Sequence, residues 1–497
     1  MLGMQKVHRF PPWPLMSTIH IPTRQLQAVN DAFILPELQR PPSLPIPNPS
    51  KSFWLEANPL ANEGSEGPLT QDADICIIGS GITGISAAYH ISKILAERQD
   101  EMLLKIAILE AREFCSGATG RNGGHLCPAA FMDFKHFQSK YGTQEAIKSL
   151  AIENHTTDSI LQYIEDEKLA DDVDLVAGGH ITLFVTEEEY NEAQADFEAT
   201  KHAGLQVNDV EWFNKEEMQM RYGVSFPGAR LATKGHNLWP LKLVQCLYNS
   251  AKSCTSRLSL HLHTHTPVTS IDPLQTNDVR RWKVNTPRGS ITTSYILHAT
   301  NAYTGYLLPH MHGPQGIIPT RGQVVALRAA CSLQDLTKTP WYANEGFEYW
   351  FPRPVKQGED FPLCILGGGR SAAGPRFEWF EVDDSTCNDA AGRALRNFLP
   401  DLFPGKYEKG REPEMEWTGI MGFTKTKDPF VGPVLYADED LKGQYVSAGY
   451  SGHGMPRAFS CAQAVSSMIL ADMFGETWKA PSWLPERFLT TERHTFE

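Results

Sequence analysis

The chain has 497 residues, of which 41% are hydrophobic and 21% charged, and its formal net charge is −13. This composition is typical of a globular protein with two or three domains, and the lack of a basic excess argues against nucleic acid or an anionic membrane as a partner. No run of about 20 apolar residues predicts a transmembrane helix. The nine cysteines lack the spacing of a metal site or a disulfide framework, so we expect reduced thiols, no bound metal and a cytoplasmic location.

Residues 1–70 are rich in proline and poorly periodic. We therefore expect an extended arm that wraps the surface rather than a folded domain. The apolar cluster Phe53-Trp54-Leu55 is expected to dock this arm onto the body of the protein.

The segment 74–84 carries the most informative motif of the chain. The apolar run Ile75–Ile78 ends in Gly-x-Gly-x-x-Gly and continues into a helical segment, which predicts a strand, a tight turn and a helix. The glycines permit close approach to a pyrophosphate at the helix N-terminus. A second apolar strand, 105–109, ends at Glu110, whose carboxylate suits the paired hydroxyls of an adenosine ribose. The pattern favours dinucleotide binding over a chance glycine turn in another α/β fold.

A glycine-rich loop, 116–126, follows the second strand. Small residues together with Arg121 suit a diphosphate and the edge of a flat ring system. A plain surface loop is the alternative.

The middle of the chain reads as a succession of structural elements. Helical spacing covers about 140–170, a strand is expected at 178–185, and acidic helices follow. A helix begins near Pro240, and a strand is expected at 258–268. In this last strand His261, His263 and His265 would share one face, where they could hold a metal; a structural role is favoured because no carboxylate or cysteine lies near.

A new sheet is expected from the segments 317–327, 348–354 and 364–370. Aromatic residues and two arginines in these segments could form a substrate pocket, although the same mixture builds ordinary sheet faces.

Near the end of the chain, the glycine-rich stretch 443–456 is expected to open a helix that runs through Met468, with Pro456 in its first turn. His453 would lie beside the partial positive charge of the helix N-terminus. This position suits stabilisation of the negative N1–C2=O edge of a reduced flavin; the alternative is a simple turn residue.

Taken together, the motifs resemble the flavin amine and amino-acid oxidoreductases that include D-amino-acid oxidase, glycine oxidase and sarcosine oxidase. Segments 117–124, 299–303 and 321–323 look most like gamma-glutamylputrescine oxidase and its fungal relatives. The resemblance spans about 70–480 and implies a mixed α/β fold: a Rossmann-like FAD-binding domain interleaved with a substrate domain on an antiparallel or mixed sheet. The implied divisions are an N-terminal arm at 1–70, FAD-binding segments at 71–150, 232–312 and 412–480, substrate segments at 151–231 and 313–411, and a tail at 481–497.

The same resemblance implies the residues that bind FAD. They are Gly79, Ser80, Gly81, Ile82, Thr83, Gly84, Glu110, Ala111, Arg112, Ser116, Gly117, Ala118, Thr119, Arg121, Asn122, Gly123, Gly124, His125, Leu126, Val268, Ala299, Thr300, Asn301, Gly419, Gly449, Ser451, Gly452, His453, Gly454 and Met455.

Two departures from the sarcosine-oxidase pattern bear on the chemistry. Ile365 falls approximately where that group carries a lysine over the flavin, and no cysteine lies between Trp417 and Pro433. We therefore expect non-covalent FAD, and the use of oxygen is in doubt.

The expected function is oxidation of a C–N bond of a small amine or amino-acid-like molecule. Hydride would pass to flavin N5, the imine would then be hydrolysed, and O2 is the expected electron acceptor. The residues expected to act in catalysis are His453, Arg353, Arg370, Tyr349 and Trp350, with the arginines as anchors for a carboxylate. Two alternatives stay open: flavin-dependent oxidation at carbon or oxygenation of a biosynthetic intermediate, and a non-catalytic FAD-binding protein.

Overall fold

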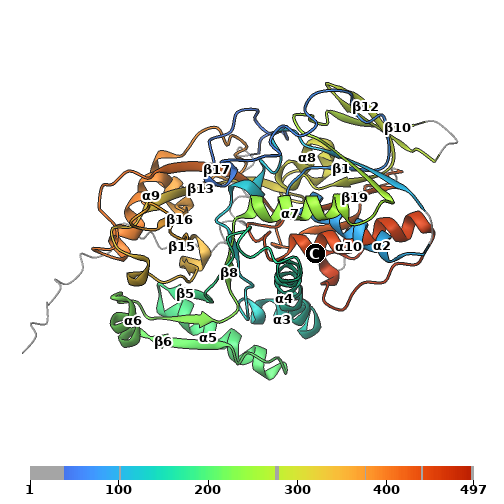
Figure 1. Cartoon of the computed structure of the whole chain (residues 1–497). Helices are drawn as coiled ribbons and strands as arrows, with labels where there is room; N and C mark the ends of the chain where they lie inside the picture. The colour runs from blue at the N-terminus through green and yellow to red at the C-terminus, as the bar shows by residue number, and fades with distance from the viewer. Residues whose placement is uncertain (1–38, 100–101, 275–278, 375, 438–439, 494–497) are drawn as a thin grey trace, which may run out of the picture.

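The computed structural model describes residues 39–99, 102–274, 279–374, 376–437 and 440–493. These residues form two eight-stranded sheets and a three-stranded sheet, with helices packed around them (Figure 1). The predicted mixed α/β fold is confirmed. Among the helices of the described residues, none is both long and apolar enough to cross a membrane.

The first sheet grows from the apolar runs at 75–78 and 105–109. Its central strands run in order β9-β2-β1-β12, all parallel, and β19 continues parallel beside the end of β12. The carboxyl ends of these strands therefore meet at one edge, where ligands bind in open α/β sheets. The strands are β1 (Asp72–Ile78), β2 (Leu104–Leu109), β9 (Leu258–His263), β10 (Ser270–Pro273), β11 (Trp282–Thr286), β12 (Gly289–His298), β18 (Phe430–Pro433) and β19 (Gln444–Ala448).

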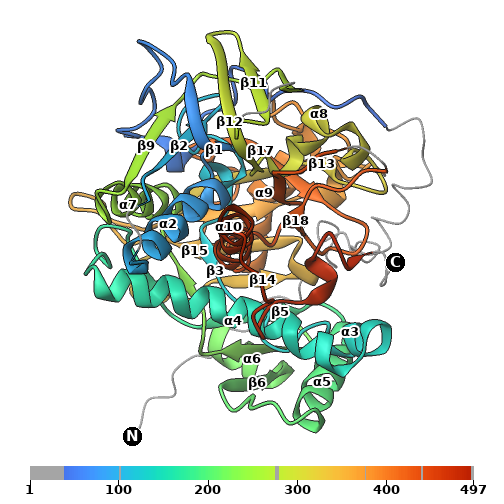
Figure 2. The same ribbon diagram turned by 90° about the vertical axis from the view of Figure 1, so that its right-hand side faces the viewer.

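Three helices pack on one face of the first sheet: α2 (Ile82–Glu97), α7 (Pro240–Ser253) and α10 (Ala458–Phe474). Helix α2 lies between the other two, as Figure 2 shows. Alternation along β1 sends Ile75 and Ile77 into the core beneath the helices, whereas Cys76 and Ile78 face a cluster that contains Trp282. This two-sided burial explains why β1 reads as a continuous apolar run.

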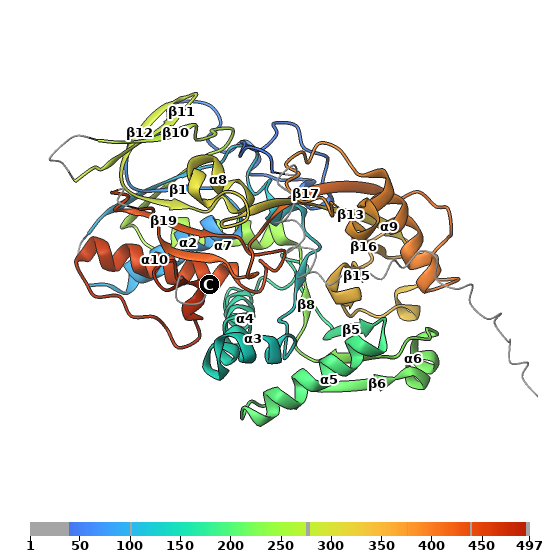
Figure 3. The ribbon, with the colours of Figure 1, turned by 180° about the vertical axis from the view of Figure 1, so that it is seen from behind.

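The second sheet has the strand order β17-β13-β16-β15-β14-β5-β7-β6, antiparallel except for the β14–β5 pair. Figure 3 shows this sheet from β17 and β13 to β5 and β6. The predicted strands at 317–327, 348–354 and 364–370 are all present and adjacent. The strands are β5 (His180–Phe184), β6 (Val210–Asn214), β7 (Gly228–Ala232), β13 (Ile318–Arg328), β14 (Trp341–Ala343), β15 (Glu348–Pro352), β16 (Leu363–Gly368) and β17 (Met415–Phe423).

The remaining elements connect and cover the sheets. The third sheet is formed by β3 (His125–Leu126), β8 (His236–Asn237) and β4 (Val176–Ala177), and the other helices are α3 (Phe134–Tyr141), α4 (Thr143–Asp166), α5 (Glu187–His202), α6 (Lys215–Tyr222), α8 (Thr304–Leu307) and α9 (Asp389–Leu402). Strand β17 belongs to the expected FAD-binding segment 412–480, yet it pairs with β13 of the second sheet. The expected domain boundaries stay a prediction.

The described part of the N-terminal arm docks through the cluster at 53–55, as expected. Trp54 is fully buried. Its indole Nε1 donates to the carbonyl of Asn122 at 2.5 Å, and its own carbonyl accepts from Trp239 at 2.8 Å. The arm thus fastens the glycine-rich loop to helix α7.

Candidate active site

A single cavity of about 1180 Å³ joins the carboxyl edge of the first sheet to one face of the second. Its volume exceeds the roughly 300–1,000 Å³ that small-ligand sites usually have. The turn after β1 and Glu110 line one end, and residues of β5, β7, β14 and β15 line the other. The cavity therefore has room for a dinucleotide and a separate small molecule.

The glycines of the turn after β1 are required by close backbone contacts. A Cβ on Gly79 would lie 2.6 Å from the carbonyl oxygen of Ala299, and Gly79 has a φ of +110°. A Cβ on Gly84 would lie 2.0 Å from the carbonyl oxygen of Gly79. Gly81 lines the cavity, so its bare backbone is open to a ligand.

Glu110 faces the cavity with both oxygens already oriented. Its Oε2 accepts from the backbone N–H of Ser80 at 3.0 Å and from the Ser80 hydroxyl at 2.7 Å, and Oε1 accepts from the N–H of Arg112 at 3.0 Å. A carboxylate offers about four acceptor positions, so about one is left for a ligand hydroxyl. Nearby, the Tyr303 hydroxyl is buried at the cavity wall without a hydrogen-bond partner among the described residues. An oriented carboxylate and a free hydroxyl fit the ribose and phosphates of FAD.

Arg121 lines the cavity, but its guanidinium is already hydrogen-bonded to the protein. Its Nε donates to the carbonyl of Ser116 at 2.8 Å, and its Nη1 donates to the carbonyls of Ser50 at 2.8 Å and Thr418 at 2.9 Å. These buried protein acceptors leave the guanidinium poorly placed for a diphosphate. Arg121 instead ties the glycine-rich loop to the N-terminal arm and to β17.

Arg112 is used in the same way. Its Nη1 lies 2.9 Å from both carboxylate oxygens of Asp384, whose side chain is fully buried, and its Nη2 donates to the carbonyl of Ser116. Although Arg112 lines the cavity, its charge is matched by Asp384. We infer that both arginines shape this wall, which leaves phosphate contacts to backbone N–H groups.

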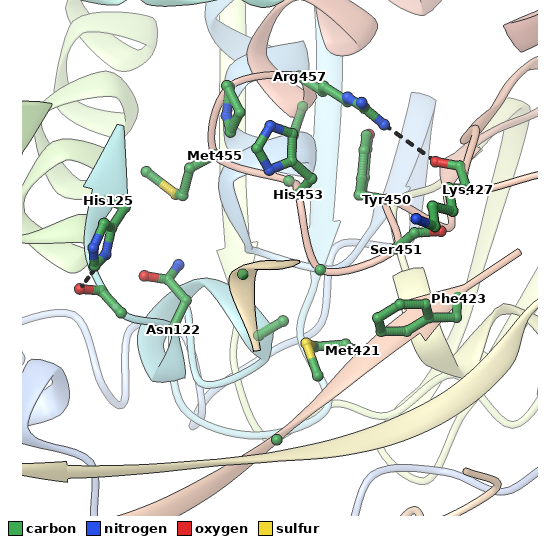
Figure 4. Close-up of a pocket in the computed structure, with 18 of the residues that line it drawn as sticks. Asn122, His125, Met421, Phe423, Lys427, Tyr450, Ser451, His453, Met455 and Arg457 are labelled. Carbon is green, nitrogen blue, oxygen red and sulfur yellow. Dashed lines mark hydrogen bonds between the residues drawn. The ribbon is translucent and has the colours of Figure 1, made fainter. Parts of the chain in front are cut away.

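His453 lines the cavity on the loop that precedes α10 (Figure 4). Its Nε2 lies 3.1 Å from Oε2 of Glu153 on α4, and the other carboxylate oxygen of Glu153 accepts from Arg457 Nε at 2.8 Å. Burial raises the pKa of the Glu153 carboxyl, but the charges of His453 and Arg457 and the hydrogen bonds outweigh burial and lower it to about 2. An ionised Glu153 therefore holds the His453 ring in place.

The sequence analysis missed Glu153. It occupies a buried position in α4, three residues after Leu150, on the apolar face of the helix. A carboxylate on an apolar helix face was the available signal, because a buried charge needs a partner.

Helix α10 begins at Ala458, so Pro456 precedes the helix and does not lie in its first turn as predicted. The preceding loop is tight: Gly449, Ser451 and Gly452 all have positive φ values. Such a loop brings the backbone of 451–455 to the cavity wall, next to His453.

A row of side chains on the second sheet forms the far end of the cavity. Strand register places Arg230, Thr182, Tyr342 and Tyr349 side by side on β7, β5, β14 and β15, and all four line the cavity. His125 stacks on Tyr342 with ring centroids 5.1 Å apart. Burial lowers the pKa of His125 to about 3, so its ring is neutral at neutral pH. This chamber is largely aromatic.

Arg370 lines the cavity, as predicted for a substrate pocket. Its Nε donates to the carbonyl of Phe377 at 3.0 Å, and its guanidinium carbon lies 4.6 Å from the ring centre of Trp379. Burial lowers the pKa of Arg370 to about 10, which still leaves it cationic at neutral pH. Arg370 therefore remains a candidate anchor for a carboxylate.

Two expected catalytic residues do not reach the cavity. Arg353 donates from Nη2 to Asp174 at 2.7 Å and lies against the ring of Trp54, away from the lining residues. Trp350 stacks on Trp341 with centroids 5.5 Å apart, on the opposite face of β15 from Tyr349. Strand alternation separates Trp350 from Tyr349, because successive side chains point to opposite faces. The cavity wall therefore lends no support to a substrate-binding role for Arg353 or Trp350.

Most of the expected FAD-binding residues line the cavity. The exceptions support its walls from behind: Gly84 packs α2 on the turn, Leu126 is in the core, and a Cβ on Gly124 would lie 2.8 Å from the carbonyl oxygen of Leu238. The expected FAD-binding residues that do not line the cavity are Ser80, Gly84, Ser116, Gly124, Leu126 and Gly449.

Other expected positions are also resolved. Ile365 lies in the core on β16 and does not line the cavity. Among the described residues that line the cavity there is no cysteine.

The three histidines of β9 and the following turn each form a hydrogen bond with a different residue: His261 with Ser259, His263 with Thr70 and His265 with Asn62.

Solved structures show how widely this fold is shared. Glycine oxidase from Geobacillus kaustophilus matches with a TM-score of 0.60 at 18% identity, covering 83% of this chain and 97% of that chain. L-proline dehydrogenase from P. horikoshii matches with a TM-score of 0.61 at 18% identity, covering 86% and 99%. These similarities establish a common fold.

Curated relatives and a family model add the sequence comparison. Gamma-glutamylputrescine oxidoreductase from Escherichia coli K12 is 25% identical over 409 residues, covering 80% of this chain and 84% of that protein. Glycine oxidase from Geobacillus kaustophilus is 23% identical over 409 residues, covering 82% and 93%. The family model described as FAD dependent oxidoreductase matches residues 74–468. The predicted resemblance and the predicted cofactor FAD are thereby confirmed, and the chain belongs to the FAD-dependent oxidoreductases of the amine and amino-acid oxidase type.

Proposed function

We propose that the protein oxidises a C–N bond of a small amine or amino-acid-like molecule, with FAD bound non-covalently and O2 as electron acceptor. The observation that carries the proposal is the continuity of the cavity. One end is lined by Gly79, Gly81 and Glu110, which suit a dinucleotide, and the other is an aromatic chamber that contains Arg370. The printed names of the relatives, glycine oxidase and gamma-glutamylputrescine oxidoreductase, support the same substrate class.

FAD would be held by the turn 79–84 and by Glu110. Gly81 and Thr83 at the start of α2 line the cavity, where backbone N–H groups would donate to a pyrophosphate; the Ile82 N–H already donates to the Thr119 hydroxyl. Glu110 would accept from the ribose. When bound, FAD supplies the hydride acceptor for the oxidation. The lack of a cysteine among the described lining residues supports non-covalent binding.

His453 would place a polar ring at the cavity wall, held there by the contact of its Nε2 with Glu153. The dipole of this ring would stabilise negative charge that develops nearby. Arg457 neutralises the rest of the charge on Glu153, through contacts of 2.8 Å and 2.7 Å.

The substrate would enter the aromatic chamber and lie against Tyr342 and Tyr349, whose rings contact each other edge-on. An amine must lose its ammonium proton before its nitrogen lone pair can assist oxidation of the adjacent carbon. Burial away from water disfavours the charged ammonium and so promotes this loss. Arg370 would bind a carboxylate of an amino-acid-like substrate and orient the C–N bond.

The test is anaerobic mixing of the holoenzyme with a panel of amines and amino acids, followed by air. We expect an amine to bleach the flavin and an imine-derived carbonyl to be released. Air should then reoxidise the flavin, and O2 should be reduced to hydrogen peroxide. Bleaching that yields a product oxidised at carbon or oxygenated would replace the proposal with that alternative. Stable yellow protein with every candidate reductant would favour a binding protein.

A further inference from the structure

Arg230 lies in the middle of β7 with only 1% of its surface exposed, and it lines the cavity. Its one hydrogen bond runs from Nη2 to the carbonyl of Ala129 at 3.4 Å, whereas Nε and Nη1 have no partner among the described residues. A buried guanidinium without a carboxylate is costly, because desolvation is not repaid by a counter-charge.

His180 adds a second unsatisfied group to the same wall. Its ring is 1% exposed, lines the cavity, and has no hydrogen-bond partner at either nitrogen among the described residues. His180 packs edge-on against Tyr342 at a centroid distance of 4.3 Å. Burial lowers the pKa of His180 well below its usual value, so the neutral ring retains one N–H to donate. Two buried, unpartnered groups that can donate hydrogen bonds thus line one end of the chamber.

Arg353 differs from Arg230 in its charged partner. Both arginines are almost fully buried and both contact an aromatic ring. Arg353, however, has Asp174 at 2.7 Å, and no ion pair to Arg230 is formed within the described residues. Arg353 therefore has a carboxylate that balances its charge, whereas Arg230 has none within 4 Å among the described residues.

We propose that Arg230 and His180 form an anion-binding subsite, which takes a carboxylate of the substrate at the opposite end of the chamber from Arg370. The proposal rests on the proposed function and refines its substrate class to amines or amino acids with a carboxylate distant from Arg370. Register along the sheet runs from Arg230 through Thr182, Tyr342 and Tyr349 to Gly367, just before Arg370. Four strand spacings correspond to about 19 Å between backbones, so the two guanidinium groups bracket the aromatic chamber.

The first experiment compares the unfolding temperatures of the ligand-free holoenzyme and two matched variants. Arg230→Met removes an unpaired buried charge, so we expect an unchanged or raised unfolding temperature. Arg353→Met removes the buried ion pair with Asp174, which keeps only Lys242 at 3.1 Å, and should lower the unfolding temperature. If R230M lowers the unfolding temperature as much as R353M does, Arg230 has a structural role and the proposal is overturned.

The second experiment measures binding of sodium glutarate, a dicarboxylate probe, from the flavin difference spectrum, with sodium chloride at equal ionic strength as control. Loss of charge-assisted hydrogen bonds should weaken glutarate binding to R230M about tenfold or more, while Arg230→Lys should retain part of the affinity. His180→Phe keeps the ring contact and should give a smaller loss.

Glutarate binding that is absent in the wild type or equal in R230M would overturn the subsite. The two proposals can also fail separately. If R230M loses glutarate binding but no amine bleaches the flavin of the wild type, the subsite stands and only the proposed function is refuted.

Discussion

Replacing Glu153 with Gln tests the buried charge cluster behind His453. Glu153 is 1% exposed and accepts hydrogen bonds from Ala129, His453 and Arg457. Its pKa is lowered from 4.5 to about 2. At about 1.36 kcal/mol per unit, the shift corresponds to about 3 kcal/mol of stability, similar to the usual cost of about 3–5 kcal/mol for breaking a buried ion pair.

The pH dependence follows from the direction of this shift. Because the folded-state pKa of Glu153 lies below the unfolded value, its contribution is fully present above pH 4.5 and is lost as the pH falls towards about 2. Urea unfolding of the holoenzyme should therefore show E153Q about 3 kcal/mol less stable than wild type at neutral pH, with the difference shrinking below pH 4.5. Equal stability at neutral pH, or a difference that does not shrink in acid, would refute this reasoning.

Glu145 offers a matched control on the same helix. It is a buried carboxylate paired with Arg487 at 3.3 Å, and it does not line the cavity. Both E145Q and E153Q should lower stability, but only E153Q should lower the flavin midpoint potential, since only Glu153 holds His453. An equal change of potential in the two variants would show that general destabilisation is responsible.

Three further results are expected. Gly84→Ala should purify with little FAD, because its Cβ would lie 2.0 Å from the Gly79 carbonyl oxygen; full occupancy, read from the ratio of flavin to protein absorbance, would contradict the role of the turn. Acid precipitation should leave all yellow colour in the supernatant, and a yellow pellet would show covalent FAD. His453→Ala should retain FAD but lower its midpoint potential by about 30–60 mV, the equivalent of a charge-assisted hydrogen bond; an unchanged potential would place His453 away from the flavin.

The dinucleotide end of the site was predictable because its signals are local. The apolar run before Gly79 became β1, the following segment became α2, and Glu110 came directly after β2. Each element is determined by residues within about ten positions of it, and the parallel pairing of β1 with β2 follows from the βαβ connection. The glycine positions then fixed where backbone could approach a ligand.

The polar contacts of the site depend on residues far apart in the chain. Glu153 and His453 are separated by 300 positions, and Arg112 and Asp384 by 272. The residues next to each partner in the sequence do not indicate which distant residue it pairs with. The sequence could therefore indicate a buried carboxylate on α4 or a charged loop near Arg121, but it could not indicate whether each charge faced a ligand or a protein partner.

The arginines on and beside the second sheet illustrate this difference. Burial lowers the pKa of Arg230, Arg353 and Arg370 alike to about 10, so burial does not distinguish a binding group from a structural one. Neighbouring aromatic residues in the sequence favoured Arg353 and Arg370, whereas Arg230 sits among small residues in Gly228–Ala232 and gave no such signal. What separates them is the partner: Asp174 neutralises Arg353, while Arg230 and Arg370 face the cavity. A substrate that brings its own anion would complete at Arg230 the pairing that the fold completes at Arg353.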